Sequence, residues 1–509
     1  MDPEPRRIRG HDGNGGRHRV HHPELSPGRS RTGHPMTVPR TSQPPRPATP
    51  KQAGRPPARP RRQAPVPRRR PARRRPLAVD LLAAAAGLGL GASLALGVSA
   101  QSVSALSAPG GVATALGRVT GMLSGYAMVI TVLLSARIPP LERTLGQDRL
   151  IVWHRRLGPW GLYLVTAHAL LITIGYARAA KTGLLAEVGQ LLWTYPGVLS
   201  TAVGTGLLLM AGVTSYRRAR RRMKYETWWA VHLYTYLGLG LSFVHQVDNG
   251  APFVGHPLAR AWWTALWVGA LAVVLAFRVA LPLWRSVRHD LRIAEVKPAG
   301  PRTWSVVLTG RRLERLPVAG GQFMMWRFLR RGLWWQAHPY SLSAAPKPGH
   351  LRITVKELGD HSTALAQLTP GTRVAFEGPY GVFTPDARRS RYVLLIGAGV
   401  GTTPIRALLE EFPRDTHVIV ILRGSRPEDI AHLDEFTKLL AHRPGRLQTL
   451  TGPRDEVRLD AAALRTLVTD VSRRDVFICG PDAFTRAVVS AALEAGVPAA
   501  RIHHEDFAF

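Results

Sequence analysis

The stretch WHRRLGPWGLYLVTAHALLITIGY, residues 153–176, decides how the rest of the chain is interpreted. It is apolar enough to cross a membrane, yet it contains two histidines, His154 and His168. Ionisable residues inside a membrane span are costly and usually mark a functional site. On an ideal helix these two imidazoles lie about 40° apart on one face and roughly 21 Å apart along the axis. The stretch therefore predicts a membrane helix that presents imidazoles at two depths.

A second apolar stretch, residues 228–247, also contains two histidines, His232 and His245. Two helices of this kind predict two b-type haems stacked across a bilayer. Each haem is held by two imidazoles, one from each helix. Bis-imidazole ligation leaves no open axial position, so such haems carry electrons rather than bind oxygen at iron. For any single membrane histidine the alternative is an interhelical hydrogen bond, whereas four histidines in matched pairs favour haem.

The direction of the two stretches predicts which histidines pair. Both are expected to run from the cytoplasm outward, which pairs His154 with His232 on the inner side and His168 with His245 on the outer side. The spacing between His232 and His245 puts their side chains about 140° apart on an ideal helix. We therefore expect either a local irregularity near the glycines of residues 238–240 or two haems rotated relative to each other.

Charge along the chain predicts the membrane topology. Residues 101–112, between the first two apolar stretches, carry no charge, whereas residues 217–224 read RRARRRMK. Cytoplasmic loops carry an excess of Lys and Arg, so the N-terminus and everything after the last span are expected in the cytoplasm of a multi-pass protein of the cell membrane, in contact with lipid. Six stretches are close to the ~20 residues that a bilayer core requires. These expected spans are 77–100, 113–136, 152–176, 190–216, 228–247 and 261–284.

After about residue 290 the sequence has the character of a soluble protein. Short β-branched segments such as TWSVVLTG and LRITVKEL, separated by Gly and Pro, predict a small antiparallel β-barrel. From Tyr392 the chain repeats a strand, a glycine turn and a helix, which predicts an α/β domain with a parallel sheet. The expected fold class is a six-span membrane α-helical bundle followed by these two domains. The expected parts are a basic tail over 1–76, the membrane part over 77–285, the barrel over 286–388 and the α/β domain over 389–509.

The charge and cysteine content limit the possible partners and cofactors. The chain has a net charge of +35, and residues 1–76 contain 20 Lys and Arg against 4 Asp and Glu. We expect this tail to be disordered and to act either as a topology signal or by attraction to anionic lipid headgroups. No nucleic-acid partner is expected, because no aromatic residues are interleaved with the charges. The single cysteine, Cys479, excludes a disulfide within the chain and a four-cysteine iron–sulfur cluster.

The motif HPYS, residues 338–341, introduces a family resemblance. It resembles the flavin-binding signature of the ferredoxin–NADP reductase superfamily, in the His-Pro form of ferric reductases and NADPH oxidases. In that family the tyrosine and serine lie against the flavin ring, and a second segment uses backbone N–H groups and a hydroxyl to hold the pyrophosphate of FAD. A glycine at a helix start suits close approach of a phosphate. The FAD contacts implied by the resemblance are His338, Pro339, Tyr340, Ser341, Val355, Lys356, Gly359, Ser362 and Thr363.

A glycine-rich turn follows the apolar strand that begins at Tyr392. In this context glycines let a phosphate reach the N–H groups of a helix, and GxGxGxxP is the form found in the same superfamily. The next strand ends in Arg423 instead of an acidic ribose ligand, with Arg426 close behind it. Cationic residues there favour a 2′-phosphate and hence NADPH over NADH, although they could simply be surface charges. The expected nucleotide contacts in the turn are Gly397, Gly399, Gly401, Thr402 and Pro404.

The resemblance also assigns roles near the C-terminus. In the family, the turn Cys479-Gly480-Pro481 lies beside the nicotinamide, whereas a buried structural thiol is the usual alternative for a lone cysteine. Members commonly end in an aromatic residue that stacks on the flavin, which indicates Phe509, with Phe507 as a competitor. With Ser341, whose family counterpart lies near the reactive flavin nitrogen, Cys479 and Phe509 are the expected catalytic residues.

Residues 77–509 as a whole resemble a single-chain ferric reductase or NADPH oxidase-type flavocytochrome. The resemblance implies electron flow from cytoplasmic NAD(P)H through FAD and two haems to an acceptor outside the cell, ferric iron or its chelates being the first expectation. Three alternatives stay open: reduction of dioxygen to superoxide, donation of electrons to a protein partner, and a membrane-anchored flavoprotein whose histidines are structural.

Overall fold

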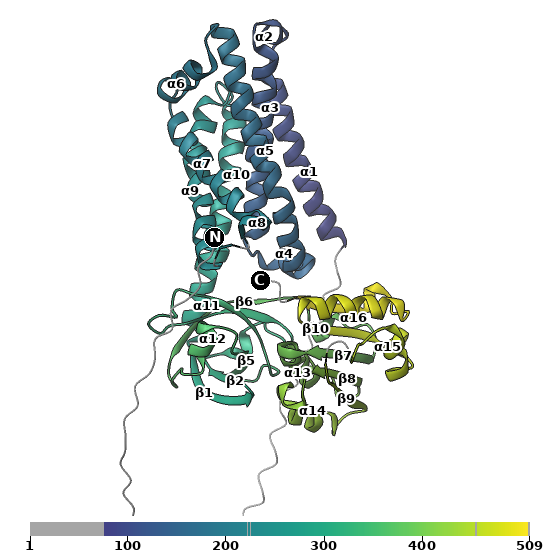
Figure 1. Cartoon of the computed structure of the whole chain (residues 1–509). Helices are drawn as coiled ribbons and strands as arrows, with labels where there is room; N and C mark the ends of the chain where they lie inside the picture. Colours follow the sequence, from purple (N-terminus) through teal and green to yellow (C-terminus); the bar gives the residue numbers. More distant parts are fainter. Residues whose placement is uncertain (1–75, 221, 224, 454–455, 507–509) are drawn as a thin grey trace, which may run out of the picture. The chain divides into compact units, whose positions relative to one another are not determined.

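The computed structural model describes residues 76–509, except residues 221, 224, 454–455 and 507–509 (Figure 1). All but the last residue of the tail expected over 1–76 therefore lies outside the described residues. In chain order the rest forms a helical part, an antiparallel sheet and a parallel sheet.

The helical part consists of long apolar helices joined by short ones. Its elements are α1 (Pro76–Ser99), α2 (Val103–Ser107), α3 (Gly111–Ser135), α4 (Pro139–Leu145), α5 (Gln147–Ala180), α6 (Leu184–Thr194), α7 (Val198–Ser215), α8 (Arg217–Arg220), α9 (Tyr225–Asn249), α10 (Pro257–Val274), the π-helical segment η1 (Leu275–Ala280) and α11 (Leu281–His289).

Five helical stretches within the described ranges are long and apolar enough to cross a membrane. They contain most of α1, α3, α5 and α7, together with α10 through α11. Large apolar side chains such as Leu81 and Leu88 on α1 are exposed, which suits contact with lipid. The remaining long helix, α9, has 25 residues but includes two histidines and polar residues at both ends. The count of six spans therefore stays a prediction.

The fourth expected span, residues 190–216, is wrong at its start. Helix α6 ends at Thr194 and α7 begins only at Val198. Proline disfavours the helical conformation of the residue before it, and Pro196 follows Tyr195. Gly197 then adopts a positive φ of 76°, which favours glycine. The Pro-Gly pair therefore breaks the expected span into two helices.

Small residues allow the membrane helices to approach closely. Between α7 and α9, a Cβ built on Gly204 would lie 2.6 Å from the carbonyl oxygen of Gly238, and one on Gly238 would lie 2.8 Å from that of Gly204. Between α3 and α5, a Cβ on Gly175 would lie 2.2 Å from Oγ1 of Thr114. Such contacts are typical of membrane helix pairs, in which packing replaces the hydrophobic effect.

The antiparallel sheet follows α11 and has the strand order β4-β3-β6-β1-β2-β5. Its core includes Trp326, Phe328 and Phe376, which are almost fully buried. An isolated bridge between Leu342 and Ile353 links the two edges of the sheet, and closure into the expected barrel stays a prediction. The elements are β1 (Leu291–Gly300), β2 (Thr303–Thr309), η2 (Leu313–Arg315), β3 (Phe323–Phe328), β4 (His338–Ser341), β5 (His350–Lys356), α12 (Asp360–Leu365) and β6 (Arg373–Tyr380).

The second sheet is parallel throughout, with the strand order β11-β10-β7-β8-β9. Alternate residues of its strands pack into two cores, one with α13 and α14 and the other with α15 and α16. Burial on both faces explains the unbroken apolar runs of these strands. The elements are η3 (Pro385–Ala387), β7 (Tyr392–Ala398), η4 (Gly399–Gly401), α13 (Thr402–Glu411), β8 (His417–Gly424), η5 (Pro427–Asp429), α14 (Leu433–Leu440), β9 (Gly445–Thr451), α15 (Ala461–Leu467), η6 (Val471–Arg473), β10 (Asp475–Gly480), α16 (Asp482–Glu494), η7 (Ala499–Arg501) and β11 (Ile502–Asp506).

The strand order locates the ligand-binding edge of this sheet. The chain proceeds from β7 outward to β8 and β9, and then returns to the other side of β7 with β10. Ligands of such sheets bind beyond the carboxyl ends of the strands where the order reverses. Here that point lies between β7 and β10, where Gly397 pairs with Cys479.

The glycine contact between α7 and α9 yields a testable prediction. Gly238→Leu should force the helices apart and lower stability by about 1–3 kcal/mol, as expected for overpacking, measured as a lower apparent unfolding temperature in detergent. Gly240→Leu is the matched control, because a Cβ at Gly240 meets nothing within 4 Å. Equal stability of the two variants would contradict the close packing of α7 on α9.

Candidate functional site

The structure brings the four membrane histidines together in the two predicted pairs. The ring centroids of His154 and His232 are 6.1 Å apart, and those of His168 and His245 are 6.4 Å apart. A metal bound between two imidazole nitrogens at about 2 Å from each leaves ring centroids roughly 6 Å apart. Both pairs therefore have the spacing that bis-histidine ligation of a haem iron requires.

The α5 histidines are oriented by backbone carbonyls of α3. Nδ1 of His154 lies 2.9 Å from the carbonyl oxygen of Thr131, and Nδ1 of His168 lies 2.7 Å from that of Gly117. A carbonyl only accepts hydrogen bonds, so Nδ1 carries the proton in both rings and Nε2 of the neutral imidazole keeps its lone pair. This is the usual arrangement of a metal-ligating histidine, in which the second nitrogen is held by a hydrogen bond.

The α9 histidines have polar neighbours of their own. Nδ1 of His232 lies 3.3 Å from Oγ of Ser215, which also accepts a hydrogen bond from Nε1 of Trp228. The indole ring of Trp228 stacks on the His232 ring with centroids 5.2 Å apart. Nδ1 of His245 lies 3.2 Å from the side-chain amide of Asn249. Both α9 rings therefore have a polar neighbour at Nδ1, but the Asn249 nitrogen is a donor that also bonds the carbonyl of Pro196, so Nδ1 of His245 accepts where the α5 rings donate.

The helix that carries His232 and His245 is continuous, although their spacing puts the side chains on different faces of an ideal helix. Helix α9 is a single α-helix from Tyr225 to Asn249, so the local irregularity proposed near residues 238–240 is wrong. The ring planes of the inner and outer pairs meet at 69° and 59°. The other alternative, two haems rotated relative to each other, stays a prediction.

A cavity beside the outer pair is lined in part by glycines of α3. It is lined by His168, His245 and mainly apolar residues. A Cβ on Gly121 would lie 2.6 Å from Nδ1 of His168, and one on Gly125 would lie 2.7 Å from the ring of Trp263. These glycines therefore let both rings pack closely against α3 at the wall of the cavity, and an apolar cavity with two imidazoles fits a haem. Sequence reasoning missed this role, although Gly117, Gly121 and Gly125 recur every four residues.

The HPYS motif forms β4, an edge strand of the antiparallel sheet. Pro339 suits an edge, since it cannot donate a hydrogen bond to a further strand. The rings of His338 and Tyr340 stack with centroids 6.3 Å apart, and burial raises the pKa of Tyr340. Ser341 is 5% exposed, and its buried Oγ has no hydrogen-bond partner among the described residues. A buried hydroxyl without a partner, on the same short strand as two stacked aromatic rings, is a group that a bound flavin could satisfy, so this motif fits the expected cofactor.

The second flavin segment lies at the end of β5 and the start of α12. Val355 is buried and Lys356 is half-buried. Oγ of Ser362 accepts hydrogen bonds from the backbone N–H groups of Leu358 and Gly359, at 2.8 and 3.0 Å. In the structure these two donors are therefore used by Ser362, and Oγ1 of Thr363 donates to the carbonyl of Gly359. The contact of this turn with a pyrophosphate stays a proposal.

The glycines of the nucleotide turn have separate roles. A Cβ on Gly401 would lie 2.2 Å from the carbonyl oxygen of Cys479, so this glycine lets the turn pack against the end of β10. Gly397 packs against the start of α13, where its Cβ would lie 3.2 Å from Cα of Thr402. Gly399 has a φ of 56°, and a Cβ there would meet nothing within 4 Å, so this side of the turn is open. Pro404 and Thr402 are buried in the first turn of α13.

The Cys479-Gly480-Pro481 turn adjoins the glycine turn across the β7–β10 pair. The Cys479 side chain is completely buried, and its Sγ lies 3.9 Å from the carbonyl oxygen of Glu505. A Cβ on Gly480 would lie 2.7 Å from the ring of Phe484. The structure thus brings both C-terminal motifs to the sheet edge where the strand order reverses. The expected aromatic residues, Phe507 and Phe509, lie outside the described residues.

The two arginines after β8 differ sharply in their surroundings. The buried Arg423 guanidinium donates to backbone carbonyls that include those of Gly452 and Pro453, at 2.7 and 2.8 Å. Its donors therefore stabilise the loop after β9 and are not free for a 2′-phosphate, which argues against its expected role. The side chain of Arg426 is 76% exposed and lies 3.9 Å from Glu428, so Arg426 is the better candidate.

Comparisons with known proteins match three segments of the chain. Family models match as a ferric reductase like transmembrane component at residues 120–243, an FAD-binding domain at 293–384 and an oxidoreductase NAD-binding domain at 395–490. A flavohemoprotein of Xylella fastidiosa is 28% identical over 207 residues, 38% of this chain and 51% of that protein. The ferredoxin reductase component of a 3-ketosteroid-9-alpha-monooxygenase from Mycobacterium tuberculosis is 32% identical over 200 residues, 38% of this chain and 56% of that protein. The chain spans about half the length of these relatives.

Two solved structures of flavin-binding proteins match part of this chain. The flavohem-like FAD/NAD binding domain of nitric oxide dioxygenase from Vibrio cholerae is 25% identical, covering 43% of this chain and 99% of that one with a TM-score of 0.37. A flavohemoglobin from Malassezia yamatoensis with bound FAD and heme is 18% identical, covering 75% of this chain and 98% of that one with a TM-score of 0.41.

The packing of the glycine turn yields a second prediction. Gly401→Ala should displace the turn from the end of β10, because its Cβ would overlap the Cys479 carbonyl. Overpacking of this kind costs about 1–3 kcal/mol. We expect a lower unfolding temperature and weaker NADPH binding, measured by scanning calorimetry and by titration of the purified protein. A Gly401→Ala variant with unchanged stability and affinity would contradict this packing.

Proposed function

We propose that this chain, whose three matched domains are those of a ferric reductase or NADPH oxidase-type flavocytochrome, moves electrons from cytoplasmic NAD(P)H to an extracytoplasmic acceptor. The route runs through FAD and two bis-histidine b-type haems, and the acceptor is ferric iron or a ferric chelate. In this assignment the basic tail is 1–76, the membrane part is 77–285, the FAD-binding part is 286–388 and the NAD(P)-binding part is 389–509.

The observation that carries the proposal is the pairing of the membrane histidines. His154 with His232, and His168 with His245, have ring spacings suited to a metal between them. In both α5 rings the Nδ1 proton is used by a carbonyl, so Nε2 is the nitrogen available for iron. Two such pairs on the same two helices provide two successive sites for electron carriers.

Residues at the edges of the two sheets would hold the other cofactors. When bound, FAD would take up hydride from NAD(P)H and the two haems would carry single electrons through the membrane part. Ser341 would donate its unpartnered hydroxyl to the flavin, with Tyr340 and His338 against the ring. Gly399 and the start of α13 would receive the nucleotide phosphates, and the turn at Cys479 would lie beside the nicotinamide.

The proposed orientation puts both nucleotide-binding parts in the cytoplasm. The basic run RRARRRMK at 217–224 marks one inner loop, and Arg285, Arg288 and Arg292 follow the last span. The connection at 101–112 has no charge and is assigned to the outside. His154 then lies on the cytoplasmic side of His168, so that the inner pair receives electrons first.

The proposal is tested by the absorption spectrum of the purified full-length protein with FAD, before and after anaerobic addition of NADPH. We expect bleaching of the flavin and a reduced b-type haem spectrum, with about two haems per chain. His168→Ala should remove about one of them, since a bis-histidine site needs both ligands. His256→Ala, which changes an exposed histidine before α10, should keep both haems.

Other outcomes of the same experiment would identify a different function. Flavin bleaching without haem would make the protein a membrane-anchored flavin reductase. Oxidation of the reduced protein by a ferric chelate under anaerobic conditions supports the proposed acceptor. Superoxide production on admitting air, with no reaction towards the chelate, would overturn that acceptor in favour of dioxygen.

Nucleotide preference yields a separate prediction. If Arg426 contacts a 2′-phosphate, Arg426→Gln should raise the KM for NADPH about three- to tenfold, because a charge-assisted hydrogen bond to an exposed group is lost. The KM for NADH should not change. Arg486→Gln is a matched control, since the Arg486 side chain on α16 is 70% exposed and pairs with Asp482. Equal effects on both nucleotides would remove Arg426 from the site.

A further inference from the structure

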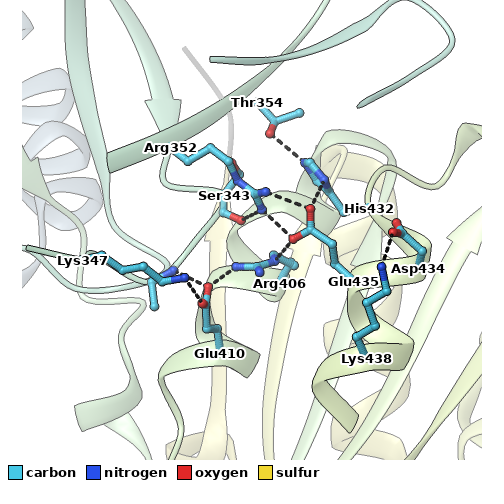
Figure 2. Close-up of polar contacts among 11 residues, drawn as sticks. Ser343, Lys347, Arg352, Thr354, Arg406, Glu410, His432, Asp434, Glu435 and Lys438 are labelled. Atoms are coloured by element: carbon cyan, nitrogen blue, oxygen red, sulfur yellow. Dashed lines mark hydrogen bonds and ion pairs between the residues drawn. The ribbon is translucent and has the colours of Figure 1, made fainter. Parts of the chain in front are cut away.

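A cluster of charged residues joins the antiparallel sheet to the parallel-sheet domain (Figure 2). Arg352 of β5 and Lys347 come from the first part, and Arg406, Glu410 and Glu435 come from helices of the second. None of these residues belongs to the flavin and nucleotide motifs described above. We call this set, together with Ser343, Thr354 and His432, the bridging cluster.

Glu435 on α14 is the centre of the bridging cluster. Its two carboxylate oxygens accept from the two terminal nitrogens of Arg352, at 2.8 and 2.9 Å. Nε of Arg406 lies 2.6 Å from one oxygen, and Nδ1 of His432 lies 3.0 Å from the other. The bidentate pairing of Arg352 with Glu435 fixes the relative orientation of the two side chains as well as their distance. The side chains of Arg352 and Glu435 are only 19% and 25% exposed, which limits screening by solvent.

The contacts of Arg352 connect the bridging cluster to the flavin motif. The Arg352 guanidinium donates to the carbonyl oxygen of Ser343 at 2.8 Å and to its Oγ at 3.2 Å. Ser343 follows Ser341 of the HPYS strand by two residues. Arg352 also lies on the strand that ends with Val355 and Lys356, the second flavin segment. The position of Arg352 is therefore coupled to both segments.

Arg406 and Glu410 connect the bridging cluster to the helix that follows the nucleotide turn. Arg406 lies on α13, which begins at Thr402 directly after the glycine turn. Arg406 also pairs with Glu410 of the same helix. Glu410 in turn accepts from the backbone N–H of Ala345 at 2.9 Å and pairs with Lys347 at 3.1 Å. The helix that carries the nucleotide turn is thus tied twice to the chain that follows the flavin motif.

His432 adds a third connection between the two parts. Its Nε2 lies 2.9 Å from Oγ1 of Thr354 on β5, while its Nδ1 contacts Glu435. The side chain is buried, and its backbone has a φ of 61°, which is uncommon for a residue other than glycine. Such a conformation persists where the surroundings fix it, and here contacts on both sides hold the ring between the two parts.

We propose that Glu435 is a positioning residue, which sets the separation and orientation of the nicotinamide relative to the flavin and thereby the rate of hydride transfer. This inference rests on the proposed function, because it concerns the transfer of hydride from NAD(P)H to FAD. A hydride is transferred only between reacting atoms in a near-attack geometry, and a misplacement of about 1 Å can cost about a hundredfold in rate. Glu435 touches neither ligand, so it acts through Arg352 and Arg406.

The charge of Glu435 is secured by its surroundings. Burial raises the pKa of this carboxyl group, but hydrogen bonds from His432 and Arg352 and the positive charge of Arg406 outweigh burial and lower the pKa below its ordinary value. The carboxylate is thus ionised at neutral pH. Replacing it by an uncharged amide of the same size removes the charge and leaves the shape, which makes Glu435→Gln the appropriate variant.

The test measures flavin reduction in the full-length protein by anaerobic stopped-flow with saturating NADPH. Glu435→Gln should slow flavin reduction about tenfold or more, while FAD content and the NADPH concentration for half-saturation stay within about threefold of wild type. With nicotinamide deuterated at the transferred position, the slowed step should show a larger kinetic isotope effect than in wild type, since hydride transfer then limits the rate more fully. A role in fold stability alone would not move that isotope effect.

The neighbouring residue provides a matched control. Asp434 precedes Glu435 on α14 and pairs with Lys438, but both side chains are more than 70% exposed. Asp434→Asn removes the same charge from the same helix and should leave the rate of flavin reduction unchanged. Equal rates in Glu435→Gln and wild type would overturn the inference, as would an equal slowing in Asp434→Asn.

A second variant removes the other partner of the Glu435–Arg352 ion pair, on the antiparallel sheet. Arg352→Gln should slow flavin reduction to a similar degree, and the double variant should be no slower than the worse single one, because both remove one interaction. Full additivity would overturn the inference. So would loss of FAD or failure to fold in both single variants, since the cluster would then support the fold rather than position the ligands.

Different results would overturn the proposed function and this inference. If wild-type protein shows no flavin bleaching with NADPH or NADH, the proposed function itself is wrong. If wild type bleaches normally and Glu435→Gln bleaches at the same rate, the function stands and only the positioning role falls.

Discussion

The membrane part depends on hydrogen bonds between α5 and backbone carbonyls of α3. Fourteen residues separate His154 from His168, and fourteen separate Gly117 from Thr131, whose carbonyls hold the two rings. The helices run in opposite directions, so the two bonds form at matched levels. A rotation or a shift of α5 by one residue would break both bonds. These contacts therefore fix the face that α5 presents to α9, and small residues such as Gly121 let the helices come close enough to form them.

The parallel sheet uses a comparable constraint at its reversal point. The strand order puts the ends of β7 and β10 side by side, and Gly401 has no side chain where it meets the Cys479 carbonyl. In both parts a glycine brings a backbone carbonyl and a neighbouring element into close contact. The functional groups are therefore positioned by the backbone, which is more rigid than a surface side chain.

Local signals predicted much of this structure, and contacts between distant segments account for what they missed. The glycine turn after β7 and the pairing of the four histidines were predicted because a short pattern sufficed for each. The break at Pro196-Gly197 had a visible signal that the apolar character of the flanking residues obscured. Arg423 was interpreted as a phosphate ligand because its partners, the carbonyls after β9, lie about thirty residues further along the chain. No sequence pattern indicates the bridging cluster, since its members come from different elements.

The membrane part orients its histidines by neutral hydrogen bonds, whereas the bridging cluster uses ion pairs. The surrounding medium explains this difference. In the membrane part a charged partner for histidine would carry a large desolvation cost, whereas the neutral carbonyls of Gly117 and Thr131 satisfy Nδ1 without burying a charge. Between the soluble parts, water reaches the edges of the bridging cluster, and the ionised pair of Glu435 and Arg352 is less costly there. Ion pairs also provide direction that a single carbonyl contact lacks. Neutral hydrogen bonds are therefore suited to carriers fixed in one place, and a bidentate ion pair is suited to two ligand-binding parts that must meet in a defined orientation.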